Sequence, residues 1–278
     1  MELLKVGRFE VYLIEDGRFW LDGGAMFGIV PKALWSKKTE SDEQNRIPLV
    51  IRPMLVRAGE HWVLVETGVD TKPGEKHRKI YRIEEAGRLL SALKAIGLTP
   101  EDIDLVINTH LHFDHAGLNV VQTEEDLVPL FKNARYLVQR EEFYEATHPH
   151  ERNRGSYLPE NIEPVAEAGL FELVEGEVEV LPGLRLVPLP GHTLGQQGVE
   201  LESEGERLVY TADLLPSFAH LPLPYIMAYD LYPVTTLETR KKNYPRWAEE
   251  GYLVVTPHDP NTPFARIREG ERGWEAFL

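Results

Sequence analysis

Three histidines and one aspartate fall within six residues, at His110, His112, Asp114 and His115. They directly follow Leu105-Val106-Ile107-Asn108, an apolar run that predicts a short buried strand. Alternate side chains of an extended segment point to the same side, so His110 and His112 can share one metal ion. Asp114 and His115 come after the chain turns and can face a second ion nearby. Imidazole and carboxylate without thiolate are typical of zinc, iron or manganese sites.

Three more candidate ligands follow in the second half of the chain, each beside a predicted strand end. His192 lies in Pro190-Gly191-His192-Thr193-Leu194-Gly195, Asp213 ends the run Tyr210-Thr211-Ala212-Asp213, and His258 ends the run Val255-Thr256-Pro257-His258. A packed core would not collect such groups, because burying unpaired polar side chains is costly. The ordered set therefore favours a metal site. His148 and His150 repeat the spacing without a strand, and we expect them at the surface.

These motifs resemble those of the metallo-β-lactamase superfamily, in the same order, from Phe9 to about His258. The resemblance implies an α/β fold, a four-layer αβ/βα sandwich of two similar halves with a dinuclear metal site between them. It implies that His110, His112 and His192 bind the first ion, that Asp114, His115 and His258 bind the second, and that Asp213 bridges the two. Two ions about 3.5–4 Å apart hold a bridging hydroxide and polarise the bond being broken. We therefore expect a metal-dependent hydrolase with two divalent ions, zinc by default, with iron or manganese as alternatives.

Within this superfamily the chain resembles the N-acyl-homoserine-lactone lactonase and parathion-hydrolase-like group. Asp22-Gly23-Gly24-Ala25-Met26-Phe27-Gly28, with Val30-Pro31-Lys32 and Trp35, looks like the N-terminal pocket loop of that group. Two positions depart from it. The group commonly has a tyrosine three residues after the bridging aspartate, where this chain has Pro216, and Glu66-Thr67-Gly68 stands where the superfamily usually has Asp-Thr-Gly.

An apolar substrate pocket is predicted beside the metals. Phe27 and Trp35, with Tyr225 and Tyr229 from an uncharged aromatic segment, are the expected substrate-binding residues. No Lys or Arg is evident beside the ligands, which favours a neutral, partly hydrophobic ester or lactone. We expect Tyr225 or Tyr229 to replace the tyrosine missing at Pro216.

Three other residues are expected to orient the ligands, and one more is a candidate for lining the pocket. They are Asn108, Thr109 and Asp259 for orientation and His220 for the pocket. Asp114 is the expected catalytic residue, because it can both bind a metal and carry a proton toward the departing oxygen.

The rest of the sequence predicts the elements that hold this site. Strands are expected at 9–14, 48–55, 61–65 and 136–139, and again at 171–174, 178–181, 184–189, 198–201, 207–211 and 253–256. A helix is expected over 82–96, an irregular glycine-rich loop over 22–31, and mostly helical structure over 119–170. Another helix should start at the capping box 235–238 and be kinked or divided by Pro245. We expect one domain over 1–278.

Composition restricts the class of protein. The 278 residues carry a net charge of −15, which disfavours nucleic acid and anionic membranes as partners. Cysteine is absent and no export signal or membrane span is evident, so we expect a cytoplasmic protein acting on a small molecule, with a homodimer possible. A phosphoester or organophosphate hydrolase on the same site is the main alternative. An oxygen-using enzyme with one iron and a non-catalytic metal-binding protein are less favoured.

Overall fold

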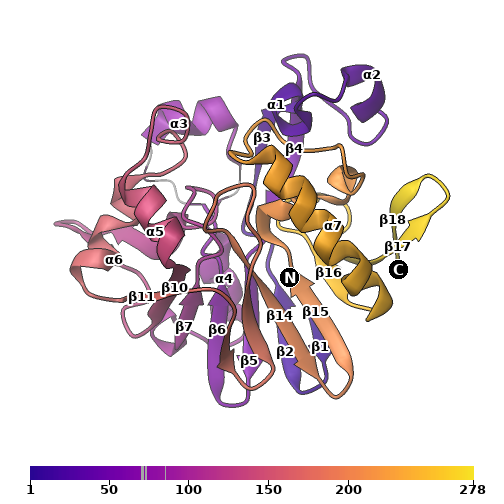
Figure 1. Ribbon diagram of the computed structural model, residues 1–278. Coiled ribbons are helices and arrows are strands. Elements are labelled where there is room, and N and C mark those ends of the chain that lie inside the picture. Colours follow the sequence, from indigo (N-terminus) through magenta and orange to yellow (C-terminus); the bar gives the residue numbers. More distant parts are fainter. Residues whose placement is uncertain (70–71, 73, 85) are drawn as a thin grey trace.

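The computed structural model describes residues 1–69, 72, 74–84 and 86–278, and its main feature is a pair of seven-stranded sheets (Figure 1). The first sheet comes from the N-terminal half of the chain, in the order β1 (Glu2–Val6), β2 (Phe9–Leu13), β5 (Met54–Ala58), β6 (His61–Val65), β7 (Leu105–Ile107), β10 (Arg135–Gln139) and β11 (Phe171–Val174). The second follows in the order β12 (Val178–Leu181), β13 (Leu184–Pro188), β14 (Gln197–Ser203), β15 (Glu206–Tyr210), β16 (Leu253–Val255), β17 (Phe264–Gly270) and β18 (Gly273–Phe277). Each sheet therefore belongs to one half of the chain.

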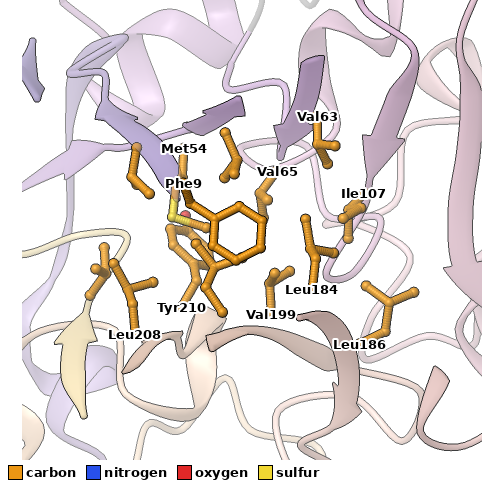
Figure 2. Close-up of a cluster of buried hydrophobic side chains, with 14 of the residues drawn as sticks. Phe9, Met54, Val63, Val65, Ile107, Leu184, Leu186, Val199, Leu208 and Tyr210 are labelled. Carbon is orange, nitrogen blue, oxygen red and sulfur yellow. The ribbon is translucent and has the colours of Figure 1, made fainter. Parts of the chain in front are cut away.

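The two sheets pack face to face through alternating apolar side chains. In β6, Val63 and Val65 point into the central core, whereas Leu64 between them points to the outer face. Successive side chains of a strand point to opposite faces of the sheet, which gives this alternation. Figure 2 shows residues of the first sheet, such as Ile107, opposite residues of the second, such as Val199.

Helices cover the outer face of each sheet. On the first sheet, Leu89 and Leu93 of α4 (Arg88–Ala95) pack in the same cluster as Leu64. On the second sheet, Tyr244 and Trp247 of α7 (Pro233–Glu249) pack against the strands from the other side (Figure 1). The predicted four-layer α/β sandwich is therefore confirmed.

Smaller elements lie at one end of the sandwich and along the outer face of the first sheet. They are the strand pairs β3 (Gly17–Asp22) with β4 (Arg46–Ile51) and β8 (Val120–Gln122) with β9 (Leu127–Pro129), and the helices α1 (Gly23–Phe27), α2 (Lys32–Trp35), α3 (Gly74–Tyr81), α5 (Arg140–Thr147) and α6 (Glu163–Glu167). The parallel pairs β6–β7 and β15–β16 direct their carboxyl ends toward this end of the molecule. The loops that follow these strands therefore meet there.

Several predicted elements differ from those observed. The helix expected over 82–96 begins only at Arg88, because Glu84 forms a β-bridge with Arg18 and Gly87 takes a left-handed φ of 86°; residue 85 lies outside the described residues. The strand expected at 48–55 is two strands, β4 and β5, in different sheets.

Other differences concern helices. The loop expected over 22–31 contains α1, which Asp22 caps through Ala25 N. The segment 119–170, expected to be mostly helical, also contains β8 and β9. α7 begins at Pro233, before the expected capping box, and continues through Pro245 as one helix. In the described part of the chain no helix is long and apolar enough to span a membrane.

Candidate metal centre

The first cluster of candidate ligands joins the two halves of the sandwich. His110 and His112 follow β7 of the first sheet, and His192 lies between β13 and β14 of the second. The distance from His192 Nε2 to His112 Nδ1 is 3.0 Å. Asp213 Oδ2 lies 3.3 Å from His192 Nε2 and 4.0 Å from His110 Nε2. These four side chains converge on one point.

The second cluster lies on the other side of Asp213. It consists of Asp114, His115 and His258, with His115 Nε2 3.2 Å from His258 Nε2 and 3.5 Å from Asp114 Oδ2. Asp213 Oδ1 lies 3.1 Å from His258 Nε2 and 3.6 Å from His115 Nε2. The two oxygens of Asp213 therefore face different clusters, which is the geometry required of a bridging carboxylate.

Hydrogen bonds behind the imidazoles fix which nitrogen faces the centre. Nδ1 of His192 lies 3.0 Å from Asp230 Oδ1, and Nδ1 of His258 lies 2.8 Å from the carbonyl oxygen of Val50. Each Nδ1–H donates to its oxygen, so Nε2 is left to bind a cation. A partner of this kind both orients a ligating histidine and raises its basicity.

Glu66 is another of these supporting groups. It is buried directly after β6, and its Oε1 lies 2.7 Å from His115 Nδ1 and 2.7 Å from Thr109 Oγ1. Thr109 Oγ1 is in turn 3.1 Å from His110 Nδ1, and Tyr210 donates to Glu66 Oε2 at 2.6 Å. Glu66 also holds a left-handed φ of 63°, which is costly for a residue with a side chain. One carboxylate therefore orients a histidine of each cluster.

Glu142 of α5 supports the first cluster from behind. Its Oε1 accepts hydrogen bonds from Leu111 N at 2.9 Å and from the Tyr157 hydroxyl at 3.0 Å, while Oε2 accepts one from Thr193 Oγ1. Leu111 separates the first two ligands of the motif, and Thr193 follows His192. Burial raises the pKa of Glu142 to about 7, although these hydrogen bonds act to lower it.

Burial and charge set the protonation of the clusters. Burial, reinforced by the neighbouring imidazoles, holds the pKa of His110 and His112 well below the ordinary value. Burial opposes ionisation of Asp213, but the imidazoles of His115, His258 and His192 outweigh it and hold its pKa well below the usual range. Burial also opposes protonation of His115 and His192, but the carboxylates beside them outweigh it and raise the pKa of both imidazoles, so a metal ion that binds here must displace protons from them.

Two buried atoms support the fit of this site to metal ions. His110 Nε2 and Asp213 Oδ1 have no hydrogen-bond partner among the described residues, although both point into the clusters. Buried polar atoms are normally paired, so unpartnered acceptors aimed at a common point indicate a cation. The nitrogen and oxygen donors suit zinc and other borderline divalent metals. The fold thus brings all seven predicted ligands together.

A cavity of about 280 Å³ opens onto both clusters. His112, Asp114, His192, Asp213 and His258 line its floor. Its walls are mainly apolar or aromatic, formed by Leu21, Met26, Tyr81, Phe113, Met227, Ala228, Tyr229 and Leu231, with a polar stretch at Arg152, Asn153 and Ser156. Of the four predicted substrate-binding residues, Tyr229 is the one that lines this cavity.

The other three predicted substrate-binding residues lie behind the wall, so their assignment is corrected. Phe27 is fully buried between Trp35, at a ring distance of 5.2 Å, and His220, at 4.5 Å, and Tyr225 contacts its edge. Because α1 is a helix, successive side chains are about 100° apart. Met26 therefore faces the cavity while Phe27 faces the core, and His220 does not line the cavity either.

The residues expected to orient the ligands differ in what they contact. Thr109 contacts His110 as expected, but Asn108 pairs with Asn119, and the Asp259 carboxylate caps backbone N–H groups at Phe218 and beyond. The carbonyl of Pro216 accepts a hydrogen bond from His258 N at 2.9 Å.

Sequence reasoning missed Glu142, Asp230 and Arg152, and their spacing gave no signal. Both Tyr81 and Tyr229 present phenol rings to the cavity, and burial raises the pKa of Tyr229 to about 12. His148 and His150 lie in the exposed segment after α5, as predicted.

Comparison with known proteins agrees with this geometry. Residues 47–258 match the model of the metallo-β-lactamase superfamily. An N-acyl homoserine lactonase from Bacillus cereus is 36% identical over 210 residues, which cover 72% of this chain and 73% of that protein. Matches to some other Bacillus lactonases are shorter and span 42% of those proteins.

Solved structures match over nearly the whole chain. A probable metal-dependent hydrolase from Staphylococcus aureus has a TM-score of 0.91 at 30% identity, covering 99% of this chain and 98% of that one. The dizinc quorum-quenching lactonase AidC, solved with the product N-hexanoyl-L-homoserine, shares the fold at 22% identity, with a TM-score of 0.82 and coverage of 99% and 96%. The chain therefore belongs to the metallo-β-lactamase superfamily of metal-dependent hydrolases.

Proposed function

We propose that this protein hydrolyses a neutral, partly hydrophobic ester or lactone at a dinuclear metal centre. The observation that carries the proposal is the pair of clusters that share Asp213 at the floor of a largely apolar cavity. The named lactonases among its relatives support the same class of bond. Zinc is the expected metal, with iron or manganese as alternatives that the same donors accept.

His110, His112 and His192 would hold one ion, Asp114, His115 and His258 the other, and Asp213 would bridge them. When bound, two such ions supply a hydroxide at neutral pH and polarise the carbonyl that it attacks. The side chains do the rest. The apolar walls exclude water from the reacting bond, and the hydrogen bonds behind the ligands keep the donors in place.

Two cavity residues have roles in handling the substrate. Asp114 lines the cavity as well as the second cluster, so its carboxylate is the group that would pass a proton to the departing oxygen. Tyr229 lines the same cavity and would orient the carbonyl in place of the tyrosine missing at Pro216. The Asp114→Asn variant, if it keeps both metals, should lose most activity on substrates with poor leaving groups.

The test is metal analysis of the purified protein followed by kcat/KM on an acyl lactone, an aryl ester and a phosphodiester. We expect two ions per chain and preference for the lactone or ester. A phosphodiester preferred by tenfold, about 1.4 kcal/mol, would favour the phosphoesterase alternative instead. One iron per chain would favour oxygen chemistry.

Variants show whether the measured activity belongs to this centre. Asp213→Ala should lose metal and activity, whereas His61→Ala should change neither, because His61 is exposed at the start of β6. The cytoplasmic location and the homodimer stay predictions.

A further inference from the structure

Arg152 lines the cavity and has no part in the proposed reaction. It lies in the segment after α5, which packs directly against the metal motif. Phe113 N donates to the carbonyl of Ser156 at 2.9 Å, and the ring of Tyr157 lies 4.7 Å from that of His112. The segment is therefore one wall of the cavity.

The turn that carries Arg152 is held in one shape by its own polar groups. His150 N donates to Asn153 Oδ1 at 2.8 Å, and Arg152 N donates to His150 Nδ1 at 3.1 Å. His150 thus shapes the turn that carries Arg152. Fixing the backbone in this way lowers the entropic cost of presenting the side chain to a ligand.

The guanidinium reaches across to the opposite wall. Arg152 Nη2 donates to the carbonyl of Ala228 at 2.7 Å, and Ala228 N donates to the carbonyl of Ala25 in α1 at 2.8 Å. This uses one of the five N–H groups of an arginine. No carboxylate lies within ion-pair distance of Arg152 in the part of the chain that the structure covers, and among those residues it is the sole Lys or Arg that lines the cavity. Arg152 is remote in sequence from the ligand motifs, beside which the sequence shows no Lys or Arg.

We propose that Arg152 is a specificity-determining residue that binds an oxygen acceptor, a carbonyl or a carboxylate, on the part of the substrate remote from the bond that is cleaved. Leu21, Met26 and Met227 offer hydrocarbon contacts in the same cavity. The preferred substrate is therefore an ester or lactone whose substituent is partly hydrocarbon and carries a second oxygen function. This inference rests on the proposed hydrolysis.

The test uses three lactones with the same ring and with substituents of equal length. One substituent is alkyl, one contains an amide carbonyl, and one ends in a carboxylate. The readout is the ratio of kcat/KM for each oxygen-bearing lactone to kcat/KM for the alkyl lactone. A hydrogen bond to a charged group supports about a ten- to hundredfold ratio in the wild type.

Three variants test whether the ratios depend on the Arg152 side chain. Arg152→Met keeps the length of the side chain without the charge and should reduce the ratios to about two or less. Arg152→Lys should retain the preference for the carboxylate better than that for the carbonyl, because it keeps the charge but not the planar fork. Arg154→Met, two residues along, removes an exposed cation that pairs with Glu151 outside the cavity, and it should leave the ratios unchanged.

Several outcomes would overturn the inference. Wild-type ratios near one, or an equal loss of kcat/KM on all three lactones in Arg152→Met, would mean that Arg152 only stabilises the cavity wall through its hydrogen bond to Ala228. The melting temperature of each variant measures loss of that hydrogen bond independently. If the wild type with both metals bound hydrolyses none of the three lactones and no aryl ester, the proposed function fails first and this inference falls with it. Hydrolysis without discrimination overturns this inference alone.

Discussion

Replacing Glu66 with glutamine should weaken metal binding at both clusters although Glu66 touches neither ion site from the cavity side. The amide has the same size but a single acceptor oxygen. It can keep the contact with His115 Nδ1 and the hydrogen bond from Thr109, which share Oε1 in the wild type. Its NH₂ then faces the Tyr210 hydroxyl, which can donate to the carbonyl of Arg52 instead. The remaining bonds are no longer to a charged acceptor.

The size of the effect follows from these contacts. A polar contact with a charged group is stronger than one with a neutral group by about 1 kcal/mol, so loss of the charge at two such contacts amounts to about 2 kcal/mol. That corresponds to about a 30-fold loss of metal affinity, within the 10- to 100-fold typical of partners behind metal-bound histidines. Because Glu66 acts on His115 directly and on His110 through Thr109, both sites should weaken.

The assay is competition for zinc between the protein and a chromophoric chelator, which gives a dissociation constant for each ion. Glu167→Gln, an exposed change of the same chemistry on α6, is the matched control and should bind zinc as the wild type does. If Glu66→Gln holds both ions within twofold of the wild type, the carboxylate does not orient the ligands and the reasoning is wrong. If metal affinity falls at the second site alone, Glu66 orients His115 but does not act on His110 through Thr109.

Three further predictions concern stability. Burial raises the pKa of Glu142 to about 7 from an ordinary value near 4.5, so between these pH values the folded state binds more protons than the unfolded state. The free energy of unfolding should therefore fall by about 3 kcal/mol as pH rises through this range. Urea unfolding of Glu142→Gln at pH 5 and pH 8 should lack this pH-dependent difference in stability. Removal of metal with a chelator should lower the melting temperature, and added zinc should restore it, because the ions bind the folded state alone. Gly28→Ala should destabilise the fold by about 1–3 kcal/mol, because at a φ of 56° its Cβ would lie 2.4 Å from the carbonyl oxygen of Ile226. Gly59→Ala is the control, since Gly59 has a φ of 66° with open space around it, and it should show only the cost of the backbone conformation. Equal losses of stability in denaturant melts of the two variants would contradict this prediction.

The sequence predicted the site better than it predicted the pocket. The seven predicted ligands could be placed together because four of them lie within six residues and the others lie three or four residues after strand ends, so local spacing indicated the geometry. Arg152 and Glu142 could not be found in this way, because their roles arise from contacts between segments far apart in the chain. Phe27 shows a third reason: its segment was expected to be a loop but forms a short helix, and an apolar pattern does not reveal which of the neighbours Met26 and Phe27 faces the cavity.

The division of the ligands between the two halves of the chain has a consequence for assembly. Neither of the two predicted ligand sets is complete within one half, since His110 and His112 need His192, and the pair Asp114 and His115 needs His258; Glu66, His110 and His115 of the first half also lie within ligand distance of one another. The two predicted sites therefore become complete only after the two sheets have docked, so metal bound at both sites marks an assembled molecule. A chain cut in the exposed turn at 175–177, between β11 and β12, would give two fragments whose reunion can be followed by zinc uptake alone, without any substrate.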